Sequence, residues 1–224
     1  VDFHYNQGEE TIQDMTVDIP AGGISALVGP SGSGKSMTLR SIAGIETPDS
    51  GRIIINGKTV FDSEAKINLK PQERRVGYLF QNYALFPTMT VEKNIACGYR
   101  GEKSKLSQKV ADYIKRYHLE GLEKHFPSQL SGGQQQRTSI GRAIIKNPSI
   151  LLCDEPTGAL DYHTSKEILK LIEDVNQKYG NTVIMVTHND AIKNMADRVI
   201  RLRDGQIRKN YVNETKIAAG DLDW

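Results

Sequence analysis

The sequence predicts an α/β fold with a parallel sheet, into which a run of helices is inserted. Apolar segments of strand length at 24–28, 150–153, 182–186 and 199–202 are separated by segments with helical periodicity. This alternation favours a parallel sheet, because a parallel connection needs a crossover that is usually a helix. The first strand is followed by a glycine-rich turn and a helical segment at 35–43, which is the typical opening of such a unit.

Shorter strands near the N-terminus predict an additional antiparallel β subdomain. We expect strands at 15–19, 52–55 and 59–61. Asn56 and Gly57 supply the positive φ angles of a tight hairpin between the last two.

The middle of the chain has helical character. In this part of the chain, helical segments are expected at 90–95, 105–117 and 132–145. Two more, at 165–176 and 190–195, are expected between the later strands. We therefore expect one domain over residues 1–224, with a core and β subdomain at about 1–85 and 146–224 and a helical subdomain at about 86–145. The tail beyond Arg208 is polar and carries no secondary-structure prediction.

Charge and cysteine content argue against several functions. The formal net charge of +2 is too small to indicate a nucleic-acid partner, and none is expected. Cys97 and Cys153 have no CxxC spacing, so neither a disulfide framework nor a zinc site is expected. No segment has the length of apolar sequence that spans a bilayer, and residues 1–5 do not resemble a signal peptide. A function at a membrane would therefore need a membrane partner.

Residues 29–36 match the phosphate-binding pattern GxxxxGK[ST], between a predicted strand and a predicted helix. The glycines allow backbone N–H groups to surround phosphates, and the helix presents its positive end to them. Lys35 is expected to reach the β- and γ-phosphates, and the Ser36 hydroxyl to ligate Mg²⁺. The residues of this motif are Gly29, Pro30, Ser31, Gly32, Ser33, Gly34, Lys35 and Ser36. In this context the motif implies a P-loop NTPase core with a RecA-like sheet.

Two carboxylates follow the apolar strand at 150–153. Ligands of α/β sheets bind beyond the carboxyl ends of the strands, so Asp154 is placed to hold Mg²⁺. Glu155 is placed to polarise a water that attacks the γ-phosphate. A solvated strand end before a turn at Pro156 is the alternative, which the phosphate-binding motif in the same chain disfavours.

A second predicted anion site begins at the sequence Leu-Ser-Gly-Gly-Gln, residues 130–134. Ser131 as N-cap and the two following glycines would expose the N–H groups of a helix N-terminus. With this motif the chain resembles the ATPases of ABC transporters, whose signature reads LSGGQ. The resemblance covers nearly the whole chain.

The resemblance implies roles for further residues. Tyr5 is similar to the aromatic residue that stacks on adenine, and Gln81 matches the Q-loop glutamine that contacts Mg²⁺ and water. Asp161 lies in a sequence similar to the D-loop, and His188 matches the switch histidine that contacts the γ-phosphate. The implied catalytic residues are Lys35, Gln81, Glu155 and His188, the implied Mg²⁺ ligands are Ser36, Gln81 and Asp154, and the implied ATP contacts also include Met37, Ser131, Gly132, Gly133 and Gln134.

The family also implies partners. Its members form head-to-tail dimers that enclose two Mg-ATP and drive transmembrane permease subunits from the cytoplasmic side of the membrane, importers with a substrate-binding protein in addition. The alternatives are a soluble ABC-type ATPase that is not coupled to transport and a nucleotide-binding module that does not hydrolyse ATP. Neither the transported substrate nor the direction of transport follows from the sequence.

Some residues depart from one family pattern. Met37 stands where the family usually has Thr, whose hydroxyl helps to hold the α-phosphate. Residues 44–48 and 71–78 resemble molybdate and sulfate importers, whereas 154–161 and 186–189 resemble lipoprotein-releasing and macrolide exporters. A hybrid of two subfamilies and simple divergence both remain open. The family further implies a permease-docking groove beside the Q-loop, which we expect to be lined by Tyr83, Leu85 and Phe86.

Overall fold

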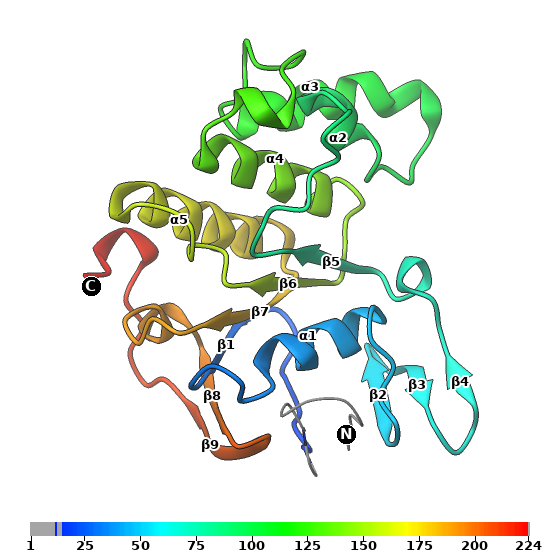
Figure 1. The fold of residues 1–224 in the computed structure, drawn as a ribbon, viewed down its shortest axis with the longest axis vertical. Coiled ribbons are helices and arrows are strands. Elements are labelled where there is room, and N and C mark those ends of the chain that lie inside the picture. Colours follow the sequence, from blue (N-terminus) through cyan, green and yellow to red (C-terminus); the bar gives the residue numbers. More distant parts are fainter. Residues whose placement is uncertain (1–11, 13–14, 224) are drawn as a thin grey trace.

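A central six-stranded sheet organises the chain. The computed structural model describes residue 12 and residues 15–223 (Figure 1). The strands lie in the order β5-β6-β7-β1-β8-β9; the first five are parallel, and β9 is antiparallel to β8. Their bounds are β1 Ile24–Val28, β5 Val76–Leu79, β6 Ile150–Asp154, β7 Thr182–Thr187, β8 Arg198–Arg203 and β9 Gln206–Val212. The predicted parallel sheet is confirmed.

Helices cover both faces of this sheet. They are α1 Lys35–Ala43, α2 Val91–Ala96, α3 Leu106–Arg116, α4 Gly132–Ile144 and α5 Tyr162–Tyr179. In Figure 1, α2, α3 and α4 lie together at one end of the molecule, whereas α1 lies on the other side of the strands. The segment between Leu79 and Ile150 therefore forms the helical part of the chain.

Alternate residues of the strands enter two separate cores, because successive side chains of a strand point to opposite faces. Leu151 and Cys153 of β6 pack with α4 and α5, whereas Leu152 between them packs with α1 and the small β-sheet. Every side chain of β7 is buried. Burial on both faces explains why these strands are continuous apolar runs in the sequence.

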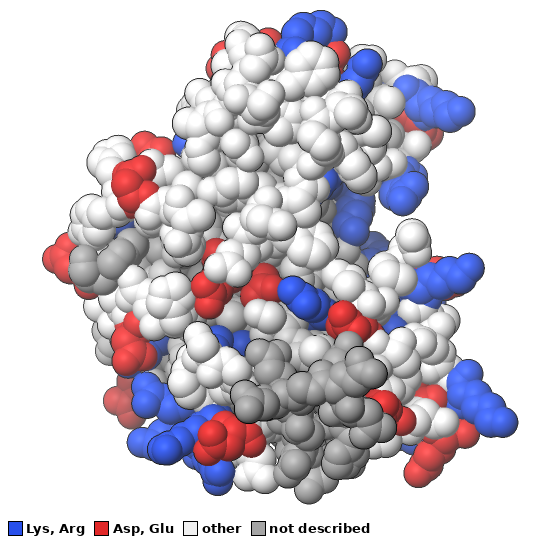
Figure 2. Space-filling view, in the orientation of Figure 1, with Lys and Arg blue, Asp and Glu red and all other residues white. Residues whose placement is uncertain are grey.

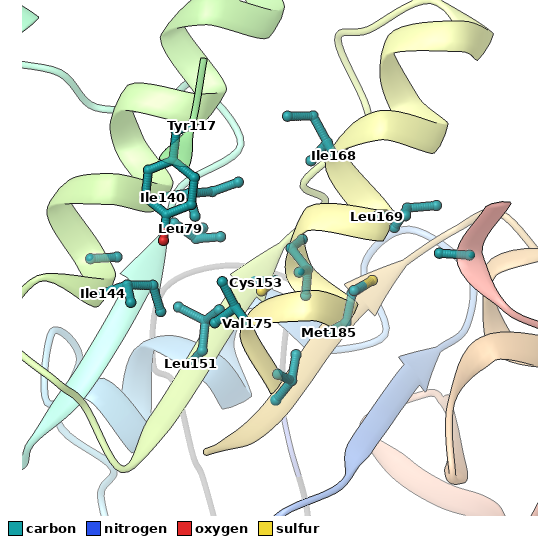
Figure 3. Close-up of a cluster of buried hydrophobic side chains, with 14 of the residues drawn as sticks. Leu79, Tyr117, Ile140, Ile144, Leu151, Cys153, Ile168, Leu169, Val175 and Met185 are labelled. Carbon is teal, nitrogen blue, oxygen red and sulfur yellow. The ribbon is translucent and has the colours of Figure 1, made fainter. Parts of the chain in front are cut away.

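Figure 3 shows the core on the α4–α5 side, where Ile140, Ile168 and Leu169 pack over Leu151 and Met185 of the sheet. Tyr117 follows α3, is fully buried, and directs its hydroxyl among the apolar side chains of this cluster. Among the described residues that hydroxyl has no hydrogen-bond partner. Burial raises the pKa of the Tyr117 phenol, so it is neutral at physiological pH.

We expect Tyr117→Phe to leave the free energy of unfolding unchanged or to raise it by up to about 1 kcal/mol, because it removes a buried polar atom without orphaning a partner. The control is Tyr113→Phe, whose hydroxyl lies 3.4 Å from that of Tyr179. Its loss should lower the free energy of unfolding by about 0.5–1.5 kcal/mol. Urea unfolding of both variants tests this, and a larger loss for Tyr117→Phe would contradict it.

A second, three-stranded antiparallel sheet lies beside α1 (Figure 1). It consists of β2 Arg52–Ile55, β3 Lys58–Asp62 and β4 Ile67–Asn68, and the hairpin turn at Asn56 and Gly57 has the expected positive φ angles. Arg74 fastens this sheet to the core, because its Nη1 donates to the carbonyl of Ser41 at 2.7 Å and its Nη2 to Asn68 Oδ1 at 2.9 Å.

Two predicted elements are wrong. Residues 15–19 form no strand; the alternation there reflects Met15, Val17 and Ile19 packing into the α1-side core. The segment at 190–195 contains only a 3₁₀ turn, Ile192–Met195. The Asn189 side chain accepts from the N–H of Ala191 at 2.9 Å, and such a local bond competes with an α-helix.

Three strands were not predicted. β4 has two residues, β5 has four and contains Gly77, and β9 is an exposed edge strand of mostly polar residues. None of them has the apolar run or clear alternation by which strands are recognised.

Within residue 12 and residues 15–223, none of the helices combines the length and apolar character needed to cross a membrane.

Candidate active site

The predicted site residues lie in a row because they follow neighbouring parallel strands. In the ladder, Val28 is level with Thr187, Val186 with Asp154, and Cys153 with Leu79. The segments that continue these strands therefore begin at one edge of the sheet. They carry Gly29 after β1, His188 after β7, Glu155 after β6 and Gln81 after β5.

The loop after β1 has the conformation of a phosphate cradle. Gly29 has a φ of 156°, and a Cβ at this position would collide with the carbonyl of Leu202. Gly34 has a φ of 92°, and a Cβ there would lie 2.6 Å from Ile12 Cγ1. Only glycine suits both positions, because the loop has positive φ angles there and its backbone packs directly on Leu202 and Ile12.

Lys35 turns back over this loop. Its ammonium donates to the carbonyls of Gly29 at 2.9 Å and Pro30 at 2.7 Å, and the residue is only 6% exposed. The Ser33 hydroxyl is buried and has no hydrogen-bond partner among the described residues. An ammonium held at the loop and a donor without a partner both suit an anion such as a phosphate group.

Oxygen ligands for a divalent cation meet at the start of α1. Ser36 Oγ donates to Asp154 Oδ1 at 2.7 Å, and Tyr78 OH donates to Asp154 Oδ2 at 2.9 Å. Burial is the largest cause that raises the pKa of the Tyr78 phenol, and the negative charge of Asp154 raises it further. The phenol therefore stays protonated and remains a donor. One hydroxyl and one carboxylate fit Mg²⁺, which usually takes one or two carboxylates together with substrate phosphates and water.

A larger protein-only metal cluster does not occur in the described part of the chain: no three or more His, Cys, Asp or Glu side chains gather so that they could hold an ion. Among the hydrogen bonds of the described residues, none joins Gln81 to Ser36 or Asp154; its amide donates to Glu155 instead. Its predicted role as a metal ligand therefore stays a prediction.

Glu155 contacts two of the other predicted catalytic residues, Gln81 and His188. Its Oε2 accepts from Gln81 Nε2 at 3.2 Å and lies 3.1 Å from His188 Nδ1. The backbone of Glu155 is left-handed, with a φ of 48°, and its N–H donates to the carbonyl of Val186 at 3.0 Å. A non-glycine residue held in this region is strained, and such strain is concentrated at functional sites.

A small cavity of about 200 Å³ lies beside Glu155. Its lining includes Gly158, Leu160, Thr187 and His188. The cavity gives a water molecule room next to the carboxylate.

The second predicted anion site lies across the sheet from the phosphate loop. Ser131 caps α4 as predicted: its hydroxyl accepts from the N–H of Gln134 at 3.3 Å, and Gln134 Oε1 accepts from the N–H of Ser131 at 2.9 Å. Gly132 packs against Leu160 and Tyr83, and Gly133 against Thr164. Because α4 and α1 pack on opposite faces of the sheet, this group does not join the phosphate loop of the same chain.

Three other predicted contacts have different outcomes. Asp161 caps α5, where its carboxylate accepts from the N–H of Thr164 at 3.0 Å and from its hydroxyl at 2.7 Å. Both hydrogen bonds lower the pKa of Asp161, and the bond from the backbone N–H of Thr164 has the larger effect. Met37 is half-buried and packs into the α1-side core. Tyr5 lies outside the described residues.

The model of the ABC transporter family matches residues 12–158, which carry the phosphate loop, the capped glycine motif and the paired carboxylates described above. The chain belongs to the ABC transporter family.

Relatives in this family are ATP-binding proteins. The chain is 41% identical over 206 residues to the sulfate/thiosulfate import ATP-binding protein CysA 1 of Agrobacterium fabrum, covering 88% of this chain and 58% of that protein. It is also 41% identical over 200 residues to the ABC transporter ATP-binding protein YtrE of Bacillus subtilis, covering 88% of this chain and 87% of that protein. The likeness to a sulfate importer agrees with the importer-like motifs of the first half, whereas the exporter-like character of the second half stays a prediction.

A solved structure of this family supports the fold. The ATP-binding cassette MJ0796, in a dimeric post-hydrolysis state bound to ADP and Pi, matches with a TM-score of 0.80 at 33% identity, covering 95% of this chain and 96% of that one. The predicted P-loop NTPase fold is thereby confirmed. The chain spans 58% of the length of CysA 1 and 63% of that of the methionine import protein MetN 2 of Salmonella typhi.

Two residues of the site were missed by the sequence reasoning. Tyr78 holds the second oxygen of Asp154, and Arg142 of α4 contacts the loop after Gln81. Tyr78 could have been found only if β5 had been recognised as the strand beside β6, and β5 lacks the pattern by which strands are recognised. Arg142 gives no comparable signal, because its contact depends on how α4 packs.

Proposed function

We propose that this chain binds Mg-ATP and hydrolyses it as the ATP-binding subunit of an ABC transporter. The observation that carries the proposal is the carboxylate of Glu155, held by Gln81 and His188 one residue beyond the Ser36–Asp154 pair. This arrangement brings a base close to the place where oxygen ligands would hold a cation and a phosphate group. Phosphoryl transfer depends mainly on such positioning and on charge stabilisation.

Each residue has a defined part in the proposed reaction. Lys35 moves from the loop carbonyls to the β- and γ-phosphates and stabilises their charge. Ser36 and Asp154 hold Mg²⁺, which when bound neutralises charge on the phosphates. Glu155 accepts a proton as the water oxygen bonds to the γ-phosphorus, and the bond from that phosphorus to the β–γ bridging oxygen breaks. His188 and Gln81 orient the carboxylate.

A homodimer completes the site in this proposal. The N-terminus of α4 is on the other side of the sheet from its own phosphate loop, so it would close over the nucleotide of a second copy. The dimeric structures of MJ0796 support this assembly by analogy at 33–34% identity.

Phosphate release by the purified chain tests the proposed activity. We expect steady turnover with ATP and Mg²⁺, and loss of turnover when EDTA removes Mg²⁺. Nucleotide binding without any turnover would instead favour a non-hydrolysing module.

The proposed membrane partner is a transmembrane permease that holds the subunit at the cytoplasmic side of the membrane. A groove of about 750 Å³ separates the sheet from the helical part, and Figure 2 shows basic side chains in a recess there. Arg75, Arg100, Arg142 and Lys146 line it together with the ring of Phe86, and no carboxylate of the described residues does. An acidic cytoplasmic helix of the permease would complement this charge.

The groove differs from the sequence expectation in its details. Of the three expected residues, Phe86 lines it and is 47% exposed, whereas Tyr83 and Leu85 do not. Tyr83 points to the start of α4, where its hydroxyl lies against Gly132. The loop therefore presents one aromatic ring to a partner rather than three side chains.

We expect Arg100→Glu to weaken co-purification with the permease by at least about tenfold, because it reverses one charge of the groove. The control is Lys109→Glu, the same charge change on the exposed face of α3 outside the groove. Candidate permeases of importer and exporter type are tested side by side; the importer-like first half predicts the importer type. Equal loss in both variants would refute docking in the groove, and binding to no permease would favour a soluble ABC-type ATPase.

The substrate class stays open in this proposal. CysA 1 is named for sulfate and thiosulfate import, and MetN 2 for methionine import, at similar identity to this chain. A substrate-binding protein belongs to the proposed assembly if the transporter is an importer.

A further inference from the structure

The loop that follows Gln81 has an unusual backbone. Tyr83 and Ala84 are successive non-glycine residues with left-handed φ angles of 60° and 46°. The N–H of Tyr83 donates to the carbonyl of Phe80 at 3.0 Å, and that of Ala84 to the carbonyl of Asn82 at 2.6 Å. Residues with a Cβ rarely adopt this conformation, and it persists only where surrounding groups enforce it.

Arg142 of α4 supplies such an enforcing contact. Its Nη1 donates to the carbonyl of Ala84 at 2.7 Å and its Nη2 to the carbonyl of Tyr83 at 3.0 Å. Its guanidinium also lies over the ring of Phe86, 5.5 Å from the ring centre. The planar fork of an arginine matches two adjacent acceptors in a way that a lysine ammonium cannot.

Two further contacts fix the same loop. Ser139, one turn earlier on α4, donates its hydroxyl to the carbonyl of Tyr83 at 3.1 Å. The fully buried Asn94 accepts from the N–H of Phe86 at 2.9 Å and donates to its carbonyl at 3.1 Å. The backbone of residues 83–86 is therefore attached to α4 and α2 at several points.

The ends of this loop reach two different places. Gln81 at its start donates to Glu155 Oε2 at 3.2 Å, whereas Phe86 at its end lines the groove together with Arg142. A displacement of residues 83–84 would move the Gln81 amide relative to the Glu155 carboxylate. Arg142 is thus in contact with the segment that joins the groove to the proposed catalytic base.

We propose that Arg142 is a positioning residue: by clamping the carbonyls of Tyr83 and Ala84, it sets the position of Gln81 at Glu155 and links α4 to the catalytic carboxylate. The inference rests on the proposed ATPase function. Arg142 touches neither Gln81 nor Glu155 in its hydrogen bonds and acts through the backbone between them. Loss of its fork should affect the chemical step more than nucleotide binding, since Lys35 and the phosphate loop are unchanged.

The decisive variant is Arg142→Lys, which keeps the charge and removes the fork. We expect kcat for ATP to fall by about tenfold or more, because small displacements of catalytic groups are costly. The KM for ATP should change by less than about twofold, as expected when ground-state binding is preserved. Hydrogen exchange at the amides of Tyr83 and Ala84 should accelerate by about tenfold, since the loop loses its clamp.

The matched control is Arg116→Lys. Arg116 is also a partly buried arginine of the helical part that lies over aromatic rings, those of Tyr113 and Tyr179, and it makes no hydrogen bond to the loop among the described contacts. We expect wild-type kcat and wild-type exchange at residues 83–84 from this control. Ser139→Ala, which removes one bond to the Tyr83 carbonyl, should lower kcat in the same direction by a smaller factor even if Arg142→Lys does not fold.

Two outcomes would overturn the inference: wild-type kcat and exchange in both Arg142→Lys and Ser139→Ala, or an equal fall of kcat in Arg116→Lys. A wild-type chain without ATPase activity would refute the proposed function instead. In that case the exchange rates still decide whether Arg142 holds the loop.

Discussion

Glu155→Gln should bind ATP as tightly as the wild type and lose turnover by about 100-fold or more, because an amide cannot accept the proton of the attacking water. The side chain keeps its size, and its amide oxygen can still accept from Gln81 Nε2, now 3.2 Å from Glu155 Oε2. Without hydrolysis, the ATP-bound homodimer should accumulate. Phosphate release measures turnover, and size-exclusion chromatography with light scattering measures the dimer.

The double variant Lys35→Ala, Glu155→Gln separates this effect from non-specific association. It should stay monomeric in ATP, because the nucleotide that joins the two copies is no longer held. Wild-type turnover in Glu155→Gln would remove Glu155 from the proposed role of base. A variant that is inactive yet monomeric at saturating ATP would leave the base in place and contradict the dimer.

Lys35→Ala should weaken ATP binding by about 100-fold, since charge-assisted hydrogen bonds contribute about 1.5–3 kcal/mol each and the ammonium is expected to make more than one. In the present structure the ammonium lies on the carbonyls of Gly29 and Pro30, within reach of any phosphate in the cradle. Calorimetric titration with ATP and Mg²⁺ measures the affinity.

Because the Lys35 ammonium also binds the carbonyls of Gly29 and Pro30, its removal could change the shape of the loop, and this needs a control. Lys35→Arg keeps the charge and a donor to these carbonyls, and thermal unfolding shows whether each variant keeps its fold. AMP, which has neither β- nor γ-phosphate, should lose much less affinity than ATP in Lys35→Ala. Equal losses for ATP and AMP would indicate a collapsed loop rather than a missing phosphate contact.

Local sequence rules predicted the parts of the fold that depend on neighbours in the chain. The α1 helix has the predicted bounds Lys35–Ala43, and α4 begins at Gly132 with Ser131 as its N-cap. Three of the strands that were found, β1, β6 and β7, are buried on both faces and give long apolar runs. The strands that were missed obtain their stability from a neighbouring strand: β9 follows β8 as a polar edge strand.

The site was predictable to the extent that its residues follow the ends of strands. The positions of Lys35, Asp154, Glu155 and His188 follow from that rule and the strand order. The contact between Gln81 and Glu155 depends on the left-handed turn at Tyr83, and that turn depends on Arg142 from a helix almost 60 residues later. A contact of that kind arises from packing and has no pattern within the sequence.

The strand order has a consequence for folding during synthesis on the ribosome. β1 lies between β7 and β8, and Ile24 is level with Val183, so its partners are translated about 160 residues later. At about 5–20 residues per second, the ribosome needs on the order of ten seconds to supply them. During that time the apolar segment Ile24–Val28, which carries the phosphate loop at its end, has neither of its native neighbours. The segment that carries the nucleotide cradle is therefore made well before the two strands that flank it, and β1 can take its native place in the sheet only after β8 has left the exit tunnel.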